Sequence, residues 1–181
     1  MNQSPLRLEH YSLKRILVEP AADDAKPAAV GSYADVGEAM LAAELNHSPP
    51  EDDGPEGRHS VSMKLELTPK ESRVFPYRIE IHIVGIFDGH DLPADRRDGL
   101  VAANGATLLY GAARDMVLTL TMRTFLGAVL LPTVAFNSFG EHVQNAKKAR
   151  QEKGPPTRVA AGVQAAEADT TPENRQHSRG A

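Results

Sequence analysis

The sequence has no cysteine and no tryptophan, and only five phenylalanines and four tyrosines among its 181 residues. Without cysteine, a disulfide scaffold, a thiolate zinc site, an iron–sulfur cluster and a cysteine nucleophile are all excluded. So few aromatic rings argue against a platform for stacking nucleic-acid bases. The formal net charge of −4 also lacks the basic excess of a general nucleic-acid binder.

Targeting and catalytic signatures are equally scarce. The first residues include acidic Glu9 and no apolar run typical of a secretory signal, so we expect a cytoplasmic protein. The apolar segment 125–136 is broken by Gly127 and Pro132 and follows Arg123, which argues against a membrane span. The chain carries no P-loop, dinucleotide fingerprint or nucleophile elbow, and its histidines lack metal-ligand spacing. We therefore expect neither an enzyme, nor a metal site, nor a cofactor.

The length predicts one domain, which we place at residues 1–146, with loop insertions at about 20–35 and 48–57. Residues 147–181 contain seven basic and four acidic residues and no Leu, Ile, Met or aromatic residue. A segment with so little apolar surface cannot offset the entropy lost on ordering. We expect it to be a disordered basic tail.

Two segments alternate regularly between apolar and polar residues, over 61–67 and 79–83, which predicts strands with one covered face in an antiparallel sheet. Residues 11–19 predict a further strand with a less regular pattern. Residues 35–47 fit either a helix or a strand, because helix-forming Glu and Ala accompany an apolar spacing typical of a helix face.

Apolar residues recur at helical spacing from 98 to 124, which predicts one long helix that covers the sheet. The predicted inner face consists of Ala102, Ala106, Leu109, Ala113, Met116 and Leu120. The remaining circumference is also largely apolar, so we expect a second burial partner: a neighbouring subunit, or alternatively the N-terminal region of the same chain. The predicted oligomer interface comprises Val101, Leu108, Arg114, Val117, Leu118 and Met122.

The uncharged segment 125–136 predicts an extended apolar connection that could line a groove for apolar ligands. Its predicted binding residues are Phe125, Leu126, Val129, Leu130, Leu131, Val134 and Phe136. The alternative is that Leu131, Val134 and Phe136 belong to the domain core. A weak, polar second helix is expected over 137–153.

Strands followed by this helix and connection resemble the SecB export-chaperone family, in its SecB-like branch. The resemblance is carried by the helix segment Asn104 to Val117, by Leu-Leu-Pro-Thr-Val-Ala-Phe at 130–136 and by Gly-Ile-Phe at 85–87. It implies an α+β fold: a four-stranded antiparallel sheet covered on one face by the long helix, plus a short second helix. The strands would be about 8–19, 36–47, 58–69 and 74–88, which makes residues 36–47 a strand.

The resemblance also implies a function and partners. Such proteins hold unfolded or preprotein clients without ATP, assemble as a dimer of dimers, and deliver clients to the SecA motor or protect an antitoxin of a toxin–antitoxin pair. The second helix here has little apolar content, and the tail differs from the one that contacts SecA, which favours client holding over export. A module that binds a small apolar ligand is the remaining alternative.

Overall fold

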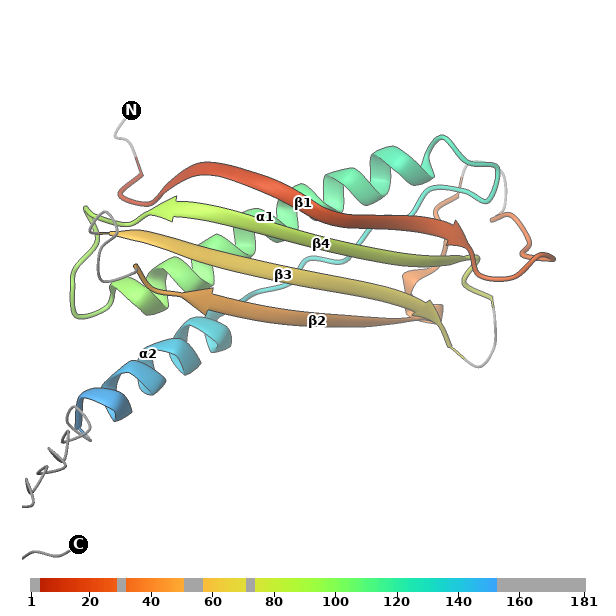
Figure 1. The fold of residues 1–181 in the computed structure, drawn as a ribbon. Helices are drawn as coiled ribbons and strands as arrows, with labels where there is room; N and C mark the ends of the chain where they lie inside the picture. The colour runs from red at the N-terminus through yellow and green to blue at the C-terminus, as the bar shows by residue number, and fades with distance from the viewer. Residues whose placement is uncertain (1–3, 29–31, 51–56, 71–73, 153–181) are drawn as a thin grey trace, which may run out of the picture.

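The computed structural model describes residues 4–28, 32–50, 57–70 and 74–152. Four strands form one antiparallel sheet in the order β1-β4-β3-β2, with β1 over Arg7–Pro20, β2 over Ala39–Ser48, β3 over Arg58–Pro69 and β4 over Tyr77–Asp88. A short 3-10 turn, η1, spans Val36–Glu38. Helix α1 (Arg97–Thr121) lies against one face of the sheet, and α2 (Asn137–Glu152) leaves the end where α1 begins (Figure 1).

The predicted α+β fold is thus confirmed, and the four strands lie close to their expected positions. Residues 39–48 form a strand, so the helix alternative for this segment is wrong. β3 and β4 show the alternation that predicted them, with every second side chain buried beneath α1. Neither helix in the described ranges is long and apolar enough to cross a membrane.

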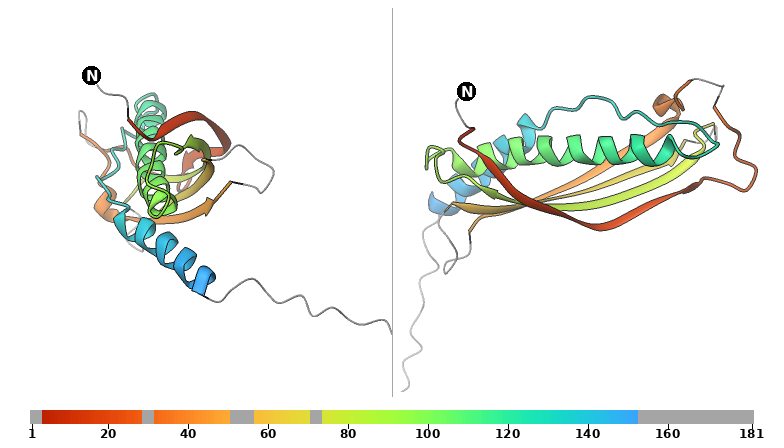
Figure 2. Two further views of the ribbon diagram at one scale, coloured as in Figure 1. Left: turned by 90° about the vertical axis from the view of Figure 1, so that its left-hand side faces the viewer. Right: turned by 90° about the horizontal axis from the view of Figure 1, so that it is seen from above.

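The core lies between α1 and the central strands (Figure 2). Ala102, Ala106, Leu109 and Ala113 are fully buried, as predicted for the inner face of the helix. The buried face then turns towards Val117 and Thr121, while Met116 is only half-buried and Leu120 is 38% exposed. In the last turns of α1, the buried positions are therefore Val117 and Thr121 rather than the predicted Met116 and Leu120.

Edge strand β1 contains two register shifts in its pairing with β4, one between Leu8 and His10 and one between Leu13 and Arg15. Each shift is a bulge, which moves the following residues to the other face of the strand. As a result, five apolar residues of β1 face the same side of the sheet although their spacing in the sequence is irregular. Each of them pairs with a residue of β4 that faces α1. These β1 residues are Leu8, Tyr11, Leu13, Ile16 and Val18.

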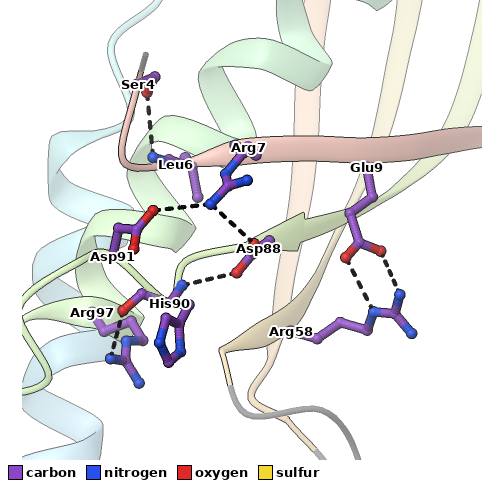
Figure 3. Close-up of polar contacts among 9 residues, drawn as sticks. All are labelled: Ser4, Leu6, Arg7, Glu9, Arg58, Asp88, His90, Asp91 and Arg97. Atoms are coloured by element: carbon purple, nitrogen blue, oxygen red, sulfur yellow. Dashed lines mark hydrogen bonds and ion pairs between the residues drawn. The ribbon is translucent and has the colours of Figure 1, made fainter. Parts of the chain in front are cut away.

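Ion pairs fix β1 at its start (Figure 3). Arg7 contacts Asp88 at the end of β4 and Asp91 in the following turn, and Glu9 reaches across β4 to Arg58. All these side chains are at least partly exposed, so each pair contributes little to stability, at most about 1 kcal/mol.

The boundary between domain and tail differs from the expected one. Helix α2 continues to Glu152, so residues 147–152, which the sequence analysis placed in the disordered tail, are helical. Lys147 explains part of this difference, because its ammonium group lies 3.1 Å from the Asp98 carboxylate of α1 and thereby holds α2 to α1. The rest of the predicted tail, 153–181, lies outside the described residues.

Candidate peptide-binding surface

The end of α1 and the apolar connection behind it are joined by a buried hydroxyl. Thr121 is fully buried; its Oγ1 donates to the Val117 carbonyl oxygen at 2.7 Å and accepts from the Val129 amide at 2.8 Å. The Thr121 side chain therefore connects the end of α1 to the backbone of the segment 122–136. A buried pair of this kind is costly to break, at roughly 1–3 kcal/mol.

Two tyrosines hold the same connection from the sheet and from the helix. The Tyr77 hydroxyl of β4 donates to the Gly127 carbonyl oxygen and also contacts the Thr124 hydroxyl. The Tyr110 hydroxyl of α1 donates to the Pro132 carbonyl oxygen at 2.8 Å. Burial raises the pKa of both phenols, so both remain protonated donors at neutral pH.

The segment that joins β1 to β2 runs beside this connection and bonds to it through the backbone. The Ala28 amide donates to the Leu126 carbonyl oxygen at 3.0 Å, and the Ala34 amide donates to that of Ala128 at 2.8 Å. Gly127 has a φ of 100°, and a Cβ there would lie 2.8 Å from the Ala28 Cβ. Glycine is thus required both by the backbone conformation and by the close approach.

The seven predicted binding residues divide between core and surface. Phe125 is 78% exposed and Leu130 is 36% exposed, while Val134 is half-buried. The other four are corrected to core positions: their side chains point beneath the connection and pack with α1 and the sheet, so a ligand cannot reach them. These four are Leu126, Val129, Leu131 and Phe136.

Further apolar side chains are exposed at this end of the sheet. The sequence reasoning missed Tyr33 and Val74, and it assigned Met122 to the oligomer interface rather than to a binding surface. Tyr33 is 58% exposed, Val74 is 62% exposed and Met122 is 66% exposed. Tyr33 belongs to the β1–β2 crossover and pairs with Ala128 through an isolated bridge. We call Tyr33, Val74, Met122, Phe125 and Leu130 the apolar end surface. The pairing of the crossover with 122–136 brings Tyr33 beside this connection, and no sequence spacing shows that pairing.

A broad cavity of about 960 Å³ is lined by two members of the apolar end surface, Tyr33 and Val74, whereas Met122, Phe125 and Leu130 lie outside it. It lies between the crossover and the β3–β4 connection, and its walls include Tyr33, Val74, Phe75 and Pro76. Asp24, Lys26, Asp35 and Lys70 also line it, so its rim carries both signs of charge. An apolar floor with a mixed polar rim fits an extended peptide segment with bulky side chains.

The predicted oligomer interface on α1 also divides. Val101 and Val117 are fully buried against the sheet of their own chain, so a neighbouring subunit cannot contact them, and these two assignments are corrected. Leu108 is 47% exposed, and Leu118 and Arg114 are half-buried. With Met122, these three residues remain accessible on the outer side of the helix.

Comparisons with known proteins give a likeness to solved structures. Neither a protein-family model nor a curated protein sequence matches the chain. Among solved structures, the fold is similar to a Mycobacterium tuberculosis SecB-like chaperone in complex with a peptide from the HigA1 antitoxin, at 18% identity and a TM-score of 0.44. The match covers 72% of this chain and 91% of that chain. The likeness concerns the fold alone.

Proposed function

We propose that this chain is an ATP-independent chaperone that holds non-native polypeptides by burying their apolar segments against the apolar end surface. The observation that carries the proposal is the exposure of Phe125, Tyr33 and Val74 at one end of the sheet, beside a cavity large enough for several side chains. Exposed apolar side chains gathered in this way are typical of interaction sites. The sequence resemblance to SecB-like chaperones points to the same function.

The surface suits a binder of many sequences. Its energy would come from apolar burial, at roughly 25 cal/mol per Å² before ordering costs are subtracted. The supporting backbone is rigid, because Thr121, Tyr77 and Tyr110 fix the connection that presents Phe125. A preformed surface loses little entropy on binding, so it can hold a client without an energy source.

The test is suppression of aggregation of an unfolded model protein, with no nucleotide added. Replacing Phe125 and Tyr33 together by serine removes the two most prominent aromatic side chains of the surface and should weaken client affinity about tenfold or more. Met40→Ser is the matched control. Met40 is 60% exposed, pairs with Thr68 on the uncovered face of the sheet, and does not line the cavity. Equal suppression by all three proteins would contradict the proposal.

A small apolar ligand is the rival occupant of the same surface. Native mass spectrometry separates the two functions, because a ligand-binding module retains a small molecule of defined mass. A holding chaperone retains none and instead forms complexes with unfolded chains.

We further propose that held clients come from a toxin–antitoxin pair rather than from the export pathway. The polar character of α2 supports this: beyond Phe139, its only apolar side chains are those of Val143 and alanines. The corresponding test titrates the purified protein with SecA and, separately, with the antitoxin of a neighbouring toxin–antitoxin pair. Binding to SecA alone would overturn the assignment.

We also propose that the chain works as a homo-oligomer. The five apolar residues of the β1 stripe (Leu8, Tyr11, Leu13, Ile16 and Val18) face the same side of the sheet as α1. Four of the five remain exposed, at 36–44%. Unpaired edge strands are usually covered or blunted, and this one is long and apolar. A second copy of the chain could cover both the stripe and the neighbouring outer side of α1.

A further inference from the structure

The apolar end surface includes one sulfur atom, that of Met122. This residue directly follows α1, its side chain is 66% exposed, and its backbone amide donates to the Leu118 carbonyl oxygen at 2.9 Å. The preceding residue, Thr121, is buried and bonded to the Val129 amide. The backbone that carries Met122 is therefore anchored, and it presents the thioether at a fixed place on the surface where clients are proposed to bind.

Methionine supplies all the sulfur of this protein. The sequence contains five methionines and no cysteine. Sulfur-containing side chains are common targets of peroxide-type oxidants, and thiols, where present, take a large share of the reaction. Because this chain has no thiol, mild oxidation falls on the methionine thioethers.

The methionines differ strongly in accessibility. Met63 is fully buried and Met116 is half-buried, whereas Met40 is 60% exposed and Met122 is 66% exposed. Met1 lies outside the described residues. Oxidation requires contact between the oxidant and the sulfur, so Met40 and Met122 should react before the two less accessible methionines. Of these two, Met122 alone belongs to the apolar end surface, since Met40 lies on the uncovered face of the sheet.

Oxidation would change what Met122 offers to a client. A peroxide transfers one oxygen atom to the sulfur: the S–O bond forms, the O–O bond breaks, the thioether is oxidised to a sulfoxide, and hydrogen peroxide is reduced to water. The thioether is flexible and apolar, so it adapts to many client side chains. The sulfoxide is polar, and burying it against an apolar client without a hydrogen-bond donor is costly.

We propose that Met122 is a modification site through which peroxide-type oxidants reversibly weaken client holding. The inference rests on the proposed chaperone function and names a regulation of that same surface. Met122 is not part of the buried core, so its oxidation acts on the surface and leaves the fold intact. Methionine sulfoxide reductases restore the thioether, so client holding would follow the balance between oxidation and reduction.

The test treats the full chain with hydrogen peroxide, removes the oxidant with catalase, and compares the affinity for an unfolded model protein before and after treatment. Peptide mass spectrometry measures the oxidised fraction at each methionine. We expect Met40 and Met122 to be oxidised ahead of Met116 and Met63. Client affinity should fall about three- to tenfold, which corresponds to the loss of roughly one buried apolar side chain. The circular dichroism spectrum should not change.

Met122→Leu is the informative variant, because leucine keeps an apolar side chain of similar volume and contains no sulfur. Each protein serves as its own reference, through the ratio of its client affinities before and after peroxide. This ratio should be close to unity in Met122→Leu. Met40→Leu is the matched control, since Met40 is similarly exposed and lies away from the apolar end surface, and it should show the same ratio as the unaltered chain. Equal ratios in all three proteins would overturn the proposal.

Reduction of the oxidised, unaltered chain gives a second readout that needs no variant. The two classes of methionine sulfoxide reductase, one for each sulfoxide epimer, should together restore the original client affinity. Failure of this recovery after complete reduction would overturn the reversible role of Met122.

Two further outcomes separate this inference from the function on which it rests. If the unoxidised chain does not suppress aggregation, the proposed function falls, and this inference falls with it. If the unoxidised chain does suppress aggregation, but Met122 either resists peroxide in the native chain or is oxidised without loss of client affinity, only the present inference falls.

Discussion

A neutral imidazole inside the protein makes folding sensitive to acid. His59 is buried beside His47, and Arg97, Asp98 and Lys147 are the other charged groups that influence it. Asp98 favours the protonated ring and the two cations oppose it, but burial dominates and holds the pKa of His59 at about 4, below the ordinary 6.5. The pKa of His47 is lowered for the same principal reason.

We predict that the contribution of His59 to the free energy of unfolding is constant above about pH 6.5 and is lost as the pH drops towards 4. The sign follows because the unfolded chain binds a proton on this histidine near pH 6.5, whereas the folded chain binds it only near pH 4, so acid favours unfolding. Full loss over this interval is roughly 3 kcal/mol. Urea denaturation across the pH range, in a phosphate-free buffer, measures it.

His59→Gln removes the titrating ring and should flatten this pH dependence. His82→Gln is the control, since His82 lies half-exposed on the uncovered face of the sheet. A slope that is the same in His59→Gln as in the unaltered chain would show that other groups cause the acid sensitivity.

Single residues explain why the binding surface could be only partly predicted from the sequence. The connection 122–136 has no helical or strand period, so its pattern does not separate exposed Phe125 from buried Leu126. Thr121 and Gly127 set the path that separates them, through a buried hydrogen bond and a positive φ. Only the strand register brings His47 and His59 to the helix-covered face of the sheet.

At the scale of elements, α1 and α2 cross where two glycines meet. A Cβ at Gly140 would lie 2.5 Å from the Gly99 carbonyl oxygen and 2.8 Å from the Ala103 Cβ, so the helices touch backbone to backbone. Gln144 reinforces the contact by accepting from the Gly99 amide at 3.2 Å and donating to the Asp95 carbonyl oxygen at 2.5 Å.

We predict that Gly140→Ala destabilises the protein by about 1–3 kcal/mol, because the added methyl group forces the helices apart. Thermal or urea unfolding followed by circular dichroism measures the change. Gly111→Ala is the matched control within α1. A Cβ at Gly111 would lie within 4 Å of none of the residues that the structure describes, so alanine should gain up to about 1 kcal/mol of helix propensity. Equal effects at both positions would contradict the close crossing.

The strands show where local pattern suffices and where it fails. β3 and β4 lie in the middle of the sheet with one covered face, and their strict alternation predicts them. The pattern of β1 is irregular because two bulges move its apolar residues from one parity to the other. β2 lies at the other edge, where most side chains are exposed. Its outward face carries apolar Met40 and Ala42, so the sequence lacks a clear alternation of apolar and polar residues. Its pairing with β3 overrides its helix propensity.

At the scale of the whole molecule, the β1 stripe is an apolar surface that one chain leaves uncovered. We predict a solution mass that is a multiple of the 19.5 kDa chain, measured by light scattering. Leu13→Asp places a charge in the middle of the stripe and should reduce the mass to that of one chain, because burying an unpaired carboxylate is costly.

Met40→Asp is the control for this change, since Met40 lies on the face of the sheet opposite to the stripe, and the variant should retain the mass of the unaltered chain. A single-chain mass for the unaltered protein would contradict the proposed assembly. It would mean that the stripe stays uncovered in solution.

The strand order also determines when each strand can pair during synthesis of the chain. β1 is made first but pairs only with β4, so that Arg7 must find Asp88 some eighty residues later along the chain. At roughly 5–20 residues per second, a newly made β1 waits about 4–16 seconds for its neighbour. Meanwhile β2 and β3, which are neighbours in the chain, can pair with each other, which is entropically cheaper. The first strand to leave the ribosome is therefore among the last to join the sheet, and its apolar residues face the solvent until β4 emerges.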